Sequence, residues 1–196
     1  MAKQTTPPGT RRRRSDADRS VAAILTATLD ELESDPDASM AAIARRAGVV
    51  RATIYVHFPT RESLLDAVME QAVGEVAEAT RAAEPERGEP TEALERVLLA
   101  TWQKLSQFQT LLAINTSRLS AKELHRRHLP VTTQFAPLIE RGQQAGIFRS
   151  DLPVTWHLAV IRAIVHTASS ELRSGRISRD EVEPAMLTTV LAAIRG

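Results

Sequence analysis

The stretch that decides the expected fold is residues 39–61, SMAAIARRAGVVRATIYVHFPTR, which predicts two short helices joined by a tight turn. Ser39 is a good N-cap for the first helix, because its hydroxyl can accept a hydrogen bond from a free backbone N–H of the first turn. Gly48 falls where that helix must stop, since glycine takes a left-handed backbone conformation at little steric cost. Pro59 ends the second helix.

The second helix, about residues 50–57, is short and offers little to a core. Ile54 is well placed to be buried, with Val49 before it and Phe58 after it. The polar side chains left to face outward are Arg51, Thr53, Tyr55 and His57. Two helices joined by a short turn containing glycine are typical of a helix-turn-helix, whose second helix lies in the major groove of DNA.

Short motifs follow one another along and just beyond this stretch. They are Ile43 and Ala44, then Ala47, Gly48 and Val49, then Thr53, Ile54 and Tyr55, then Phe58, and after Pro59 a basic residue with Glu62 and Leu64. In order and spacing they resemble the DNA-binding signature of the TetR family of transcriptional regulators. The sequence departs from that pattern at Val50, Ala52 and Val56. The resemblance implies an all-α fold, with an N-terminal three-helix helix-turn-helix domain and a C-terminal helical domain for ligand binding and dimerisation.

The composition favours a soluble helical protein. A chain of 196 residues fits one domain or two small ones, and 43% hydrophobic with 25% charged residues is ordinary for a globular protein. The absence of cysteine excludes disulfides, thiolate metal sites and cysteine catalysis. No apolar run approaches the about 20 residues that cross a bilayer, and no secretory signal is recognisable. We therefore expect a cytoplasmic protein with no membrane contact.

Basic charge is concentrated near the N-terminus. Residues 1–61 hold 10 Lys and Arg against 7 Asp and Glu, whereas residues 62–196 hold 15 against 17. Residues 1–15 have no apolar periodicity and include the run Arg11 to Arg14, which predicts a disordered basic tail. Such a run is often simply solvated, but beside a DNA-binding domain it could also contact phosphates or a minor groove.

Helical periodicity continues along the rest of the chain. The family resemblance implies a DNA-binding domain over residues 16–76, with its reading motif at 39–58, and an effector-binding and dimerisation domain over residues 77–196. The expected helices outside the motif cover about residues 16–34, a segment from Thr60 past Val76, a segment from Thr91, residues 121–145 with bends at Pro130 and Pro137, residues 153–174 and residues 180–195. No alternation long enough to build a sheet is present.

The last two predicted helices carry more apolar residues than a surface pair needs. Packing against their own copies would form a four-helix dimer interface, since contiguous exposed apolar patches usually mark association sites. Burial within one monomer is the alternative. We expect a homodimer through these helices.

Eight residues are candidates for contact with a double-stranded DNA operator: Ser39, Val50, Arg51, Ala52, Thr53, Tyr55, His57 and Arg61. Arg51 can contact guanine O6 and N7 together, although it could equally meet a phosphate. Thr53 could touch a base, and Ser39 could present a helix N-terminus to phosphate. Val50 and Ala52 can offer only apolar contact or close approach.

The family resemblance implies backbone contacts for three of these residues, Tyr55, His57 and Arg61. The ring of Tyr55 could also pack against the first helix. Arg45 and Arg46 lie on the helix before the turn, where they are solvated or near phosphate.

The resemblance also implies a pocket for an unknown small-molecule effector in the C-terminal domain. The candidates are polar or aromatic residues among apolar ones: Trp102, Asn115, Arg118, His128, Trp156, His157 and His166. Effector pockets are mostly apolar with a few polar groups. Each of these side chains could instead be part of the core or exposed to solvent.

Catalytic and metal sites are not expected, and no cofactor is predicted. His125 and His128 could share a metal on one helix face, but Arg126 and Arg127 repel a cation and the HExxH order is missing. No G-x-S-x-G motif and no phosphate-binding glycine loop occurs. The chain is therefore not expected to be an enzyme.

These observations predict a homodimeric repressor that a small-molecule effector releases from a palindromic operator. Two alternatives remain open. The chain could be a ligand-binding or enzymatic helical domain with a vestigial helix-turn-helix, which Val50 and Val56 would favour. It could also be a DNA-binding regulator without small-molecule control.

Overall fold

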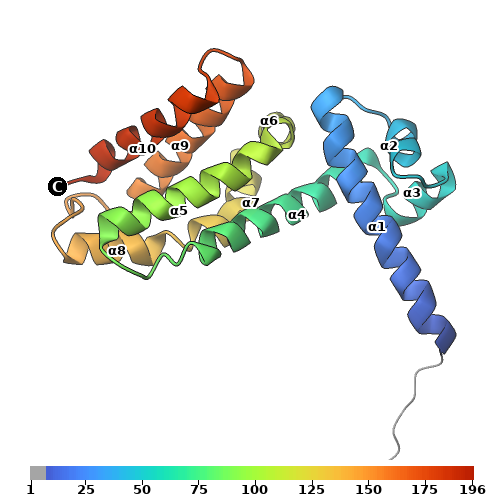
Figure 1. The fold of residues 1–196 in the computed structure, drawn as a ribbon, viewed down its shortest axis with the longest axis horizontal. Helices are drawn as coiled ribbons and strands as arrows, with labels where there is room; N and C mark the ends of the chain where they lie inside the picture. Colours follow the sequence, from blue (N-terminus) through green and yellow to red (C-terminus); the bar gives the residue numbers. More distant parts are fainter. Residues whose placement is uncertain (1–7) are drawn as a thin grey trace, which may run out of the picture. The chain divides into compact units, whose positions relative to one another are not determined.

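A computed structural model describes residues 8–196, with side chains from Asp16 onward, and shows an all-α protein. Its helices are α1 (Pro8–Ser34), α2 (Met40–Arg46), α3 (Arg51–His57), α4 (Arg61–Ala82), α5 (Pro90–Leu105), the 3₁₀ helix η1 (Ser106–Phe108), α6 (Gln109–Arg118), α7 (Ala121–Thr132), α8 (Ala136–Gln144), α9 (Val154–Arg173) and α10 (Arg179–Ile194) (Figure 1). An isolated β-bridge joins Phe148 and Arg195. The predicted fold class is confirmed.

The chain forms two compact units that divide between Met69 and Glu70, within α4. The domain boundary expected after residue 76 falls in the same helix. None of the helices in the described part of the chain is both long and apolar enough to span a membrane.

Helix α1 begins at Pro8, earlier than the start expected at residue 16. Proline is well suited to the first turn of a helix, and arginine has a good helix propensity, so the residues before Asp16 can extend it. The tail predicted over residues 1–15 is thus helical from residue 8. Its residues 1–7, and the side chains of Arg11 to Arg14, lie outside what the structure describes.

The N-terminal unit is held together by side chains from all of its helices. Helix α2 packs against both α1 and α3. The largest fully buried side chains of the N-terminal unit are Ile24, Leu32, Ile43, Ile54, Leu64 and Leu65. The buried hydroxyl of Thr28 donates to the carbonyl of Ile24 at 2.7 Å, so this polar group is satisfied inside its own helix. A core of this kind fixes the short α3 in place.

In the C-terminal unit the predicted helix over residues 121–145 is two helices, α7 and α8. Pro137 is in the first turn of α8, where its missing N–H costs nothing, whereas Pro130 is accommodated inside α7. The chain therefore breaks before Pro137 and not at Pro130.

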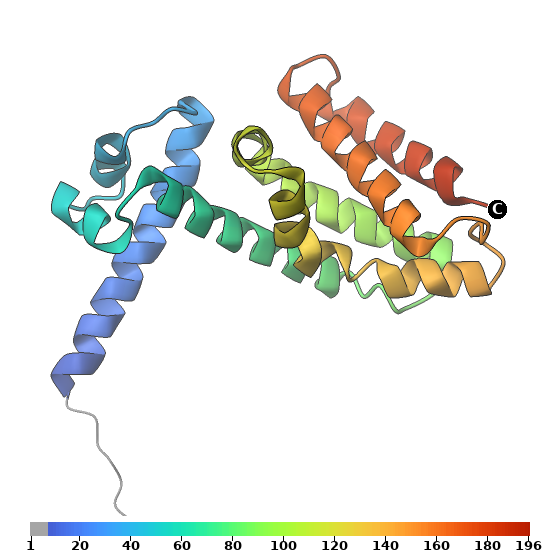
Figure 2. The same ribbon diagram turned by 180° about the vertical axis from the view of Figure 1, so that it is seen from behind.

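Helices α9 and α10 lie side by side at the end of the chain (Figures 1 and 2). The C-terminal end of α10 is hydrogen-bonded to the segment after α8, because the N–H of Arg149 donates to the carbonyl of Ile194 at 2.9 Å. Helices α5, α8, α9 and α10 share one hydrophobic core. This core includes the fully buried rings of Trp102 and Phe148.

A close contact at Gly142 shapes this core. Gly142 is buried on α8, and a Cβ placed there would overlap the ring of Phe148. By contrast, a Cβ at Gly74, inside α4, would meet no other atom. The two glycines therefore differ in what an added methyl group would do.

We expect Gly142→Ala to lower the free energy of unfolding by about 2 kcal/mol or more, because the Phe148 ring must move out of a packed core. Gly74→Ala should raise it by about 0.5 to 1 kcal/mol, since alanine is the better helix former and the space is open. Urea unfolding of both variants measures this, with each serving as the control for the other. A Gly142→Ala protein as stable as the parent would contradict the packing.

Candidate DNA-binding surface

The start of α2 is capped as the sequence predicts. The Ser39 hydroxyl accepts a hydrogen bond from the N–H of Ala42 at 3.2 Å, and Ser39 itself has an extended backbone. The helix buries Met40, Ile43 and Ala44. Because Ser39 is exposed at this corner, its hydroxyl is accessible while it caps the helix.

The turn between α2 and α3 depends on Gly48. Its φ is +68°, a left-handed conformation that side chains disfavour, and its N–H donates to the carbonyl of Arg45 at 3.2 Å. The N–H of Val49 then donates to the carbonyl of Ala44 at 3.0 Å, which closes the helix end. Both predicted features of the turn are confirmed.

Helix α3 buries one side chain, that of Ile54, which is 0% exposed. Phe58 follows it and is 7% exposed. Val50 and Val56 are 70% and 78% exposed, although both are apolar. These two of the three departures from the family pattern thus lie on the open surface of α3 and play no part in the core.

Arg51 and Tyr55 lie one turn apart on this surface and contact each other. The guanidinium carbon of Arg51 is 5.6 Å from the centroid of the Tyr55 ring, within the range of a cation–π interaction. Tyr55 is 39% exposed. Its ring is therefore available on the same face as the Arg51 charge.

The remaining α3 candidates differ in exposure. Ala52 is exposed, whereas Thr53 and His57 are half-buried. The imidazole of His57 lies 6.4 Å from the Phe58 ring, centroid to centroid, so it is held beside the end of the core. Thr53 and His57 have part of their surface free for contact with a ligand.

Arg61 has a structural partner that the sequence does not reveal. Its Nη2 donates to the carbonyl of Pro36 at 2.6 Å, and its Nε donates to the carbonyl of Ala38 at 3.4 Å. The first turn of α4 is thereby fixed to the segment that leads into α2. Backbone carbonyls have no residue signature, so no sequence pattern could have announced this contact.

Arg46 is also engaged within the unit. Its guanidinium pairs with Asp30 at 3.3 Å and with Glu31 at 3.4 Å, both on α1. Arg45 is exposed on the same helix. Of these two arginines, Arg46 therefore links α2 to α1.

We expect Arg61→Ala to lower the free energy of unfolding of the N-terminal unit by about 1 to 2 kcal/mol, because two carbonyls lose a charged donor. Arg51→Ala is the matched control, since Arg51 is exposed and its contact with Tyr55 is worth about 0.5 kcal/mol. Thermal and urea unfolding distinguish the two. Equal stabilities for both variants would show that the Arg61 contacts are not needed.

The predicted effector residues are distributed over α5, α6, α7 and α9. Trp102 is 0% exposed and its Nε1 is buried without a hydrogen-bond partner. The buried Asn115 donates to the carbonyl of Leu111 at 3.0 Å and accepts from Nη2 of Arg118 at 2.9 Å. Nε2 of the buried His157 lies 3.1 Å from the carbonyl of Arg149. Asn115 and His157 thus have structural partners.

Trp156, His128 and His166 have other environments. Trp156 is 55% exposed at the start of α9. The rings of His128 and His166 meet edge to face, with centroids 5.6 Å apart. Burial is the largest cause that lowers the pKa of His128, to about 4, followed by the charges of His166, Arg162 and His125. Burial and then Arg162 also lower the pKa of His166.

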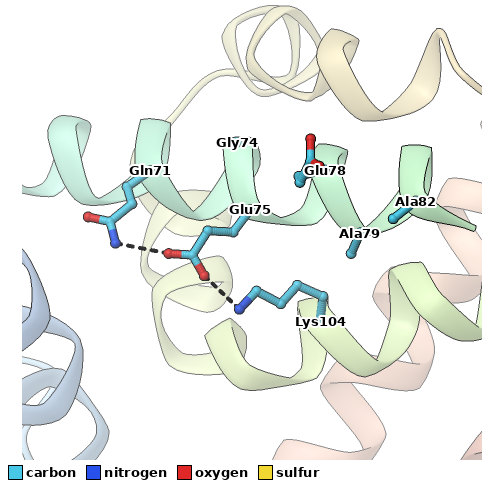
Figure 3. A pocket seen from close by; sticks show the side chains of 7 residues that line it. All are labelled: Gln71, Gly74, Glu75, Glu78, Ala79, Ala82 and Lys104. Carbon is cyan, nitrogen blue, oxygen red and sulfur yellow. Dashed lines mark hydrogen bonds and ion pairs between the residues drawn. The ribbon is translucent and has the colours of Figure 1, made fainter.

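A groove of about 520 Å³ lies along α4 and α5 in the C-terminal unit (Figure 3). It is lined by Gln71, Gly74, Glu75, Glu78, Ala79, Ala82 and Lys104. Lys104 pairs with Glu75 at 2.6 Å, and Gln71 donates to the same carboxylate at 2.9 Å. The hydrogen bond from Lys104, and next the one from Gln71, lower the pKa of Glu75. None of the predicted effector residues lines this groove.

Metal chemistry finds no support among the residues that the structure describes. No group of three or more His, Asp or Glu side chains lies together as a metal ion would need. His125 is instead bonded to Arg162, with 2.9 Å between Nδ1 and Nη1.

A capped first helix, a glycine turn and a second helix that buries one residue define a helix-turn-helix protein of the DNA-binding class. Residues 24–68 match the family model described as bacterial regulatory proteins, tetR family. This match makes residues 24–68 a TetR-type DNA-binding domain, and the chain is a DNA-binding transcriptional regulator. Proteins of this kind are not enzymes.

Solved structures agree with this fold. The regulator LfrR from Mycobacterium smegmatis, solved in complex with proflavine, is 23% identical with a TM-score of 0.71, and the match covers 91% of this chain and 98% of that chain. A TetR-family regulator from Marinobacter aquaeolei VT8 is 19% identical with a TM-score of 0.66, covering 93% and 98%.

The ketosteroid regulator KstR2 of Mycobacterium tuberculosis is 18% identical with a TM-score of 0.67, covering 90% of this chain and 95% of that chain. Comparison with curated proteins gave no match. At these identities the structural likenesses establish the fold alone.

Proposed function

We propose that this protein is a cytoplasmic, homodimeric repressor that binds a palindromic operator through α3 and leaves it when a small-molecule effector binds in the C-terminal unit. The observation that carries the proposal is the exposure of α3. This helix buries Ile54, and the side chains of Arg51, Tyr55, Val56 and the N-cap residue Val50 are open to a ligand. A helix presented in this way can enter a major groove.

The residues of this surface divide by chemistry into base readers and backbone contacts. Arg51 would read guanine, and Thr53 and the exposed methyl groups of Val50 and Ala52 would contact base edges or thymine methyls. Tyr55, His57, Arg61 and Ser39 would position the helix on phosphates. Arg61 can do so with guanidinium N–H groups that the carbonyls of Pro36 and Ala38 leave free.

A dimer through α9 and α10 is supported by the character of their outer surface. Every exposed residue between 155 and 170 and between 184 and 192 is uncharged. These residues are Thr155, Trp156, Ala163, Thr167, Ser170, Pro184, Ala185, Thr188, Thr189 and Ala192. In a chain with 25% charged residues, such a surface is better suited to a partner helix than to water. A two-fold pairing of α9 and α10 would cover it on both copies.

Effector control is supported by a structural neighbour. LfrR was solved in complex with proflavine, a small molecule. The mechanism is a coupling free energy, since the effector must bind the arrangement that cannot hold DNA more tightly than the one that can.

Selection of bound fragments from genomic DNA, followed by gel shifts over a salt series, tests the DNA-binding step. We expect a preferred palindromic site. Arg51→Ala should cost about 1 to 3 kcal/mol at one base pair of each half-site and relax the preference there. Arg45→Ala, which removes an exposed charge from α2, is the control and should weaken all sequences alike. A protein that retains no sequence selectively at any salt would refute the operator model.

Sedimentation of a charge variant tests the dimer. Ala163 is exposed in the middle of α9, so Ala163→Glu places a charge in the proposed interface. We expect the dimer dissociation constant to rise by about a hundredfold or more, because the carboxylate would be buried without a partner. Ala121→Glu, at the exposed start of α7, is the matched control and should leave the dimer intact. If the Ala163→Glu protein remains dimeric at low concentration, the dimer interface does not include the middle of α9.

A further inference from the structure

Four basic side chains meet where α7 faces α9. His125 and His128 are three residues apart on α7, and Arg162 and His166 are four apart on α9, so each pair projects from one side of its helix. Nη1 of Arg162 lies 2.9 Å from Nδ1 of His125, and the rings of His128 and His166 meet edge to face. We call these residues, His125, His128, Arg162 and His166, the basic cluster.

No carboxylate balances the basic cluster within the described residues. The charges that act on His128 are those of His166, Arg162 and His125, and the charge that acts on His166 is that of Arg162. The acid of α7 is Glu123, which binds Arg126 and Arg127. The acid of α9 is Glu171, which binds Arg176. Helix α6, which packs on both helices, has no acidic residue.

The cluster also has unused hydrogen-bonding capacity. Nδ1 of His128 is buried without a partner, which is costly for a polar atom. Arg162 can only donate, so Nδ1 of His125 must be the acceptor in their contact, and the proton of that imidazole is on Nε2. A guanidinium has five N–H groups, and one of those on Arg162 makes this contact. The cluster therefore has hydrogen-bonding groups, including donors of Arg162, that no hydrogen bond among the described residues uses.

Helix α7, which carries two residues of the basic cluster, packs weakly against the rest of the unit. No residue of helix α7 is fully buried, and Leu129 on it is 39% exposed. A helix with few buried apolar contacts opens at low cost, so a ligand could enter beneath it. We propose that the basic cluster is the effector site and that its ligand is an anion, specifically the carboxylate group of an organic acid.

The fit rests on charge and geometry. A carboxylate accepts from guanidinium in a bidentate manner and from imidazole N–H groups at the same time. It would complete the contact between α7 and α9, which otherwise joins one guanidinium and three imidazoles. This inference rests on the proposed effector control, because it names the chemical class of that effector.

Isothermal titration calorimetry on the full chain tests the site directly. The probes are benzoate and octanoate, and the neutral isosteres benzamide and octanamide carry no charge. We expect the acids to bind at least about tenfold more tightly than the amides. Arg162→Gln should weaken the acids about tenfold or more, since it removes the charged donor. Arg173→Gln removes an exposed charge from the same helix and should leave binding within about twofold of the parent.

Proton uptake on ligand binding is a second measurement, and it would not change if the histidines of the basic cluster had a purely structural role. Titrations at about pH 6 in buffers of different ionisation enthalpy should show protons taken up with the acids, because an anion favours the charged imidazole. His128→Asn should reduce that uptake. Circular dichroism and the melting temperature establish that each variant is folded.

The outcomes separate this inference from the proposed function. Equal binding of acids and amides, no binding of either acid, or unchanged binding by Arg162→Gln would overturn the site. If sulfate binds as tightly as the carboxylates, the proposal that the ligand is an organic acid is wrong and the site is a general anion site. Since none of these titrations uses DNA, carboxylate binding with no selective operator binding would support the site while refuting the repressor.

Discussion

The burial of Ile54 is the contact on which the candidate DNA-binding surface depends. Helix α3 has seven residues, and an isolated helix of that length is not stable in water. Full burial of an isoleucine side chain contributes about 1.5 to 3 kcal/mol, which is large for so short an element. Gly48 sets the angle at which α3 leaves α2, and Phe58 closes the far end. With one side chain fully buried, α3 keeps Arg51, Ala52, Tyr55 and Val56 exposed.

The local signals in the sequence were sufficient to predict most of the helices and the helix-turn-helix. Ser39, Gly48 and Pro59 act on the backbone within a few residues, so their effect does not depend on the rest of the fold. The two prolines of the segment 121–145 show the limit. Both can interrupt a helix, yet only the break before Pro137 occurs, because tertiary packing decides which proline falls at a first turn.

The side-chain roles were harder to predict for a physical reason. Arg61 binds carbonyls and His157 lies against one, and any residue can supply a carbonyl. Trp102 and Asn115 were candidates for a pocket because they are polar or aromatic residues in an apolar region, but that description also fits core residues. His128 and His166 are brought together from helices far apart in the sequence. Spacing within one helix could not reveal that contact.

The basic cluster links ligand chemistry to the stability of α7. In the unfolded chain a histidine titrates near its ordinary value, 6.5, whereas in the fold the pKa of His128 is lowered to about 4. The unfolded state therefore binds more protons between these values, and the stability of the fold falls as the pH drops through that window. An anion beside His128 acts in the opposite direction, because it favours the charged imidazole and raises its pKa. A carboxylate ligand would thus offset the free-energy cost of burying His128 without a partner. Its contacts with both helices would stabilise the packing of α7 against α9.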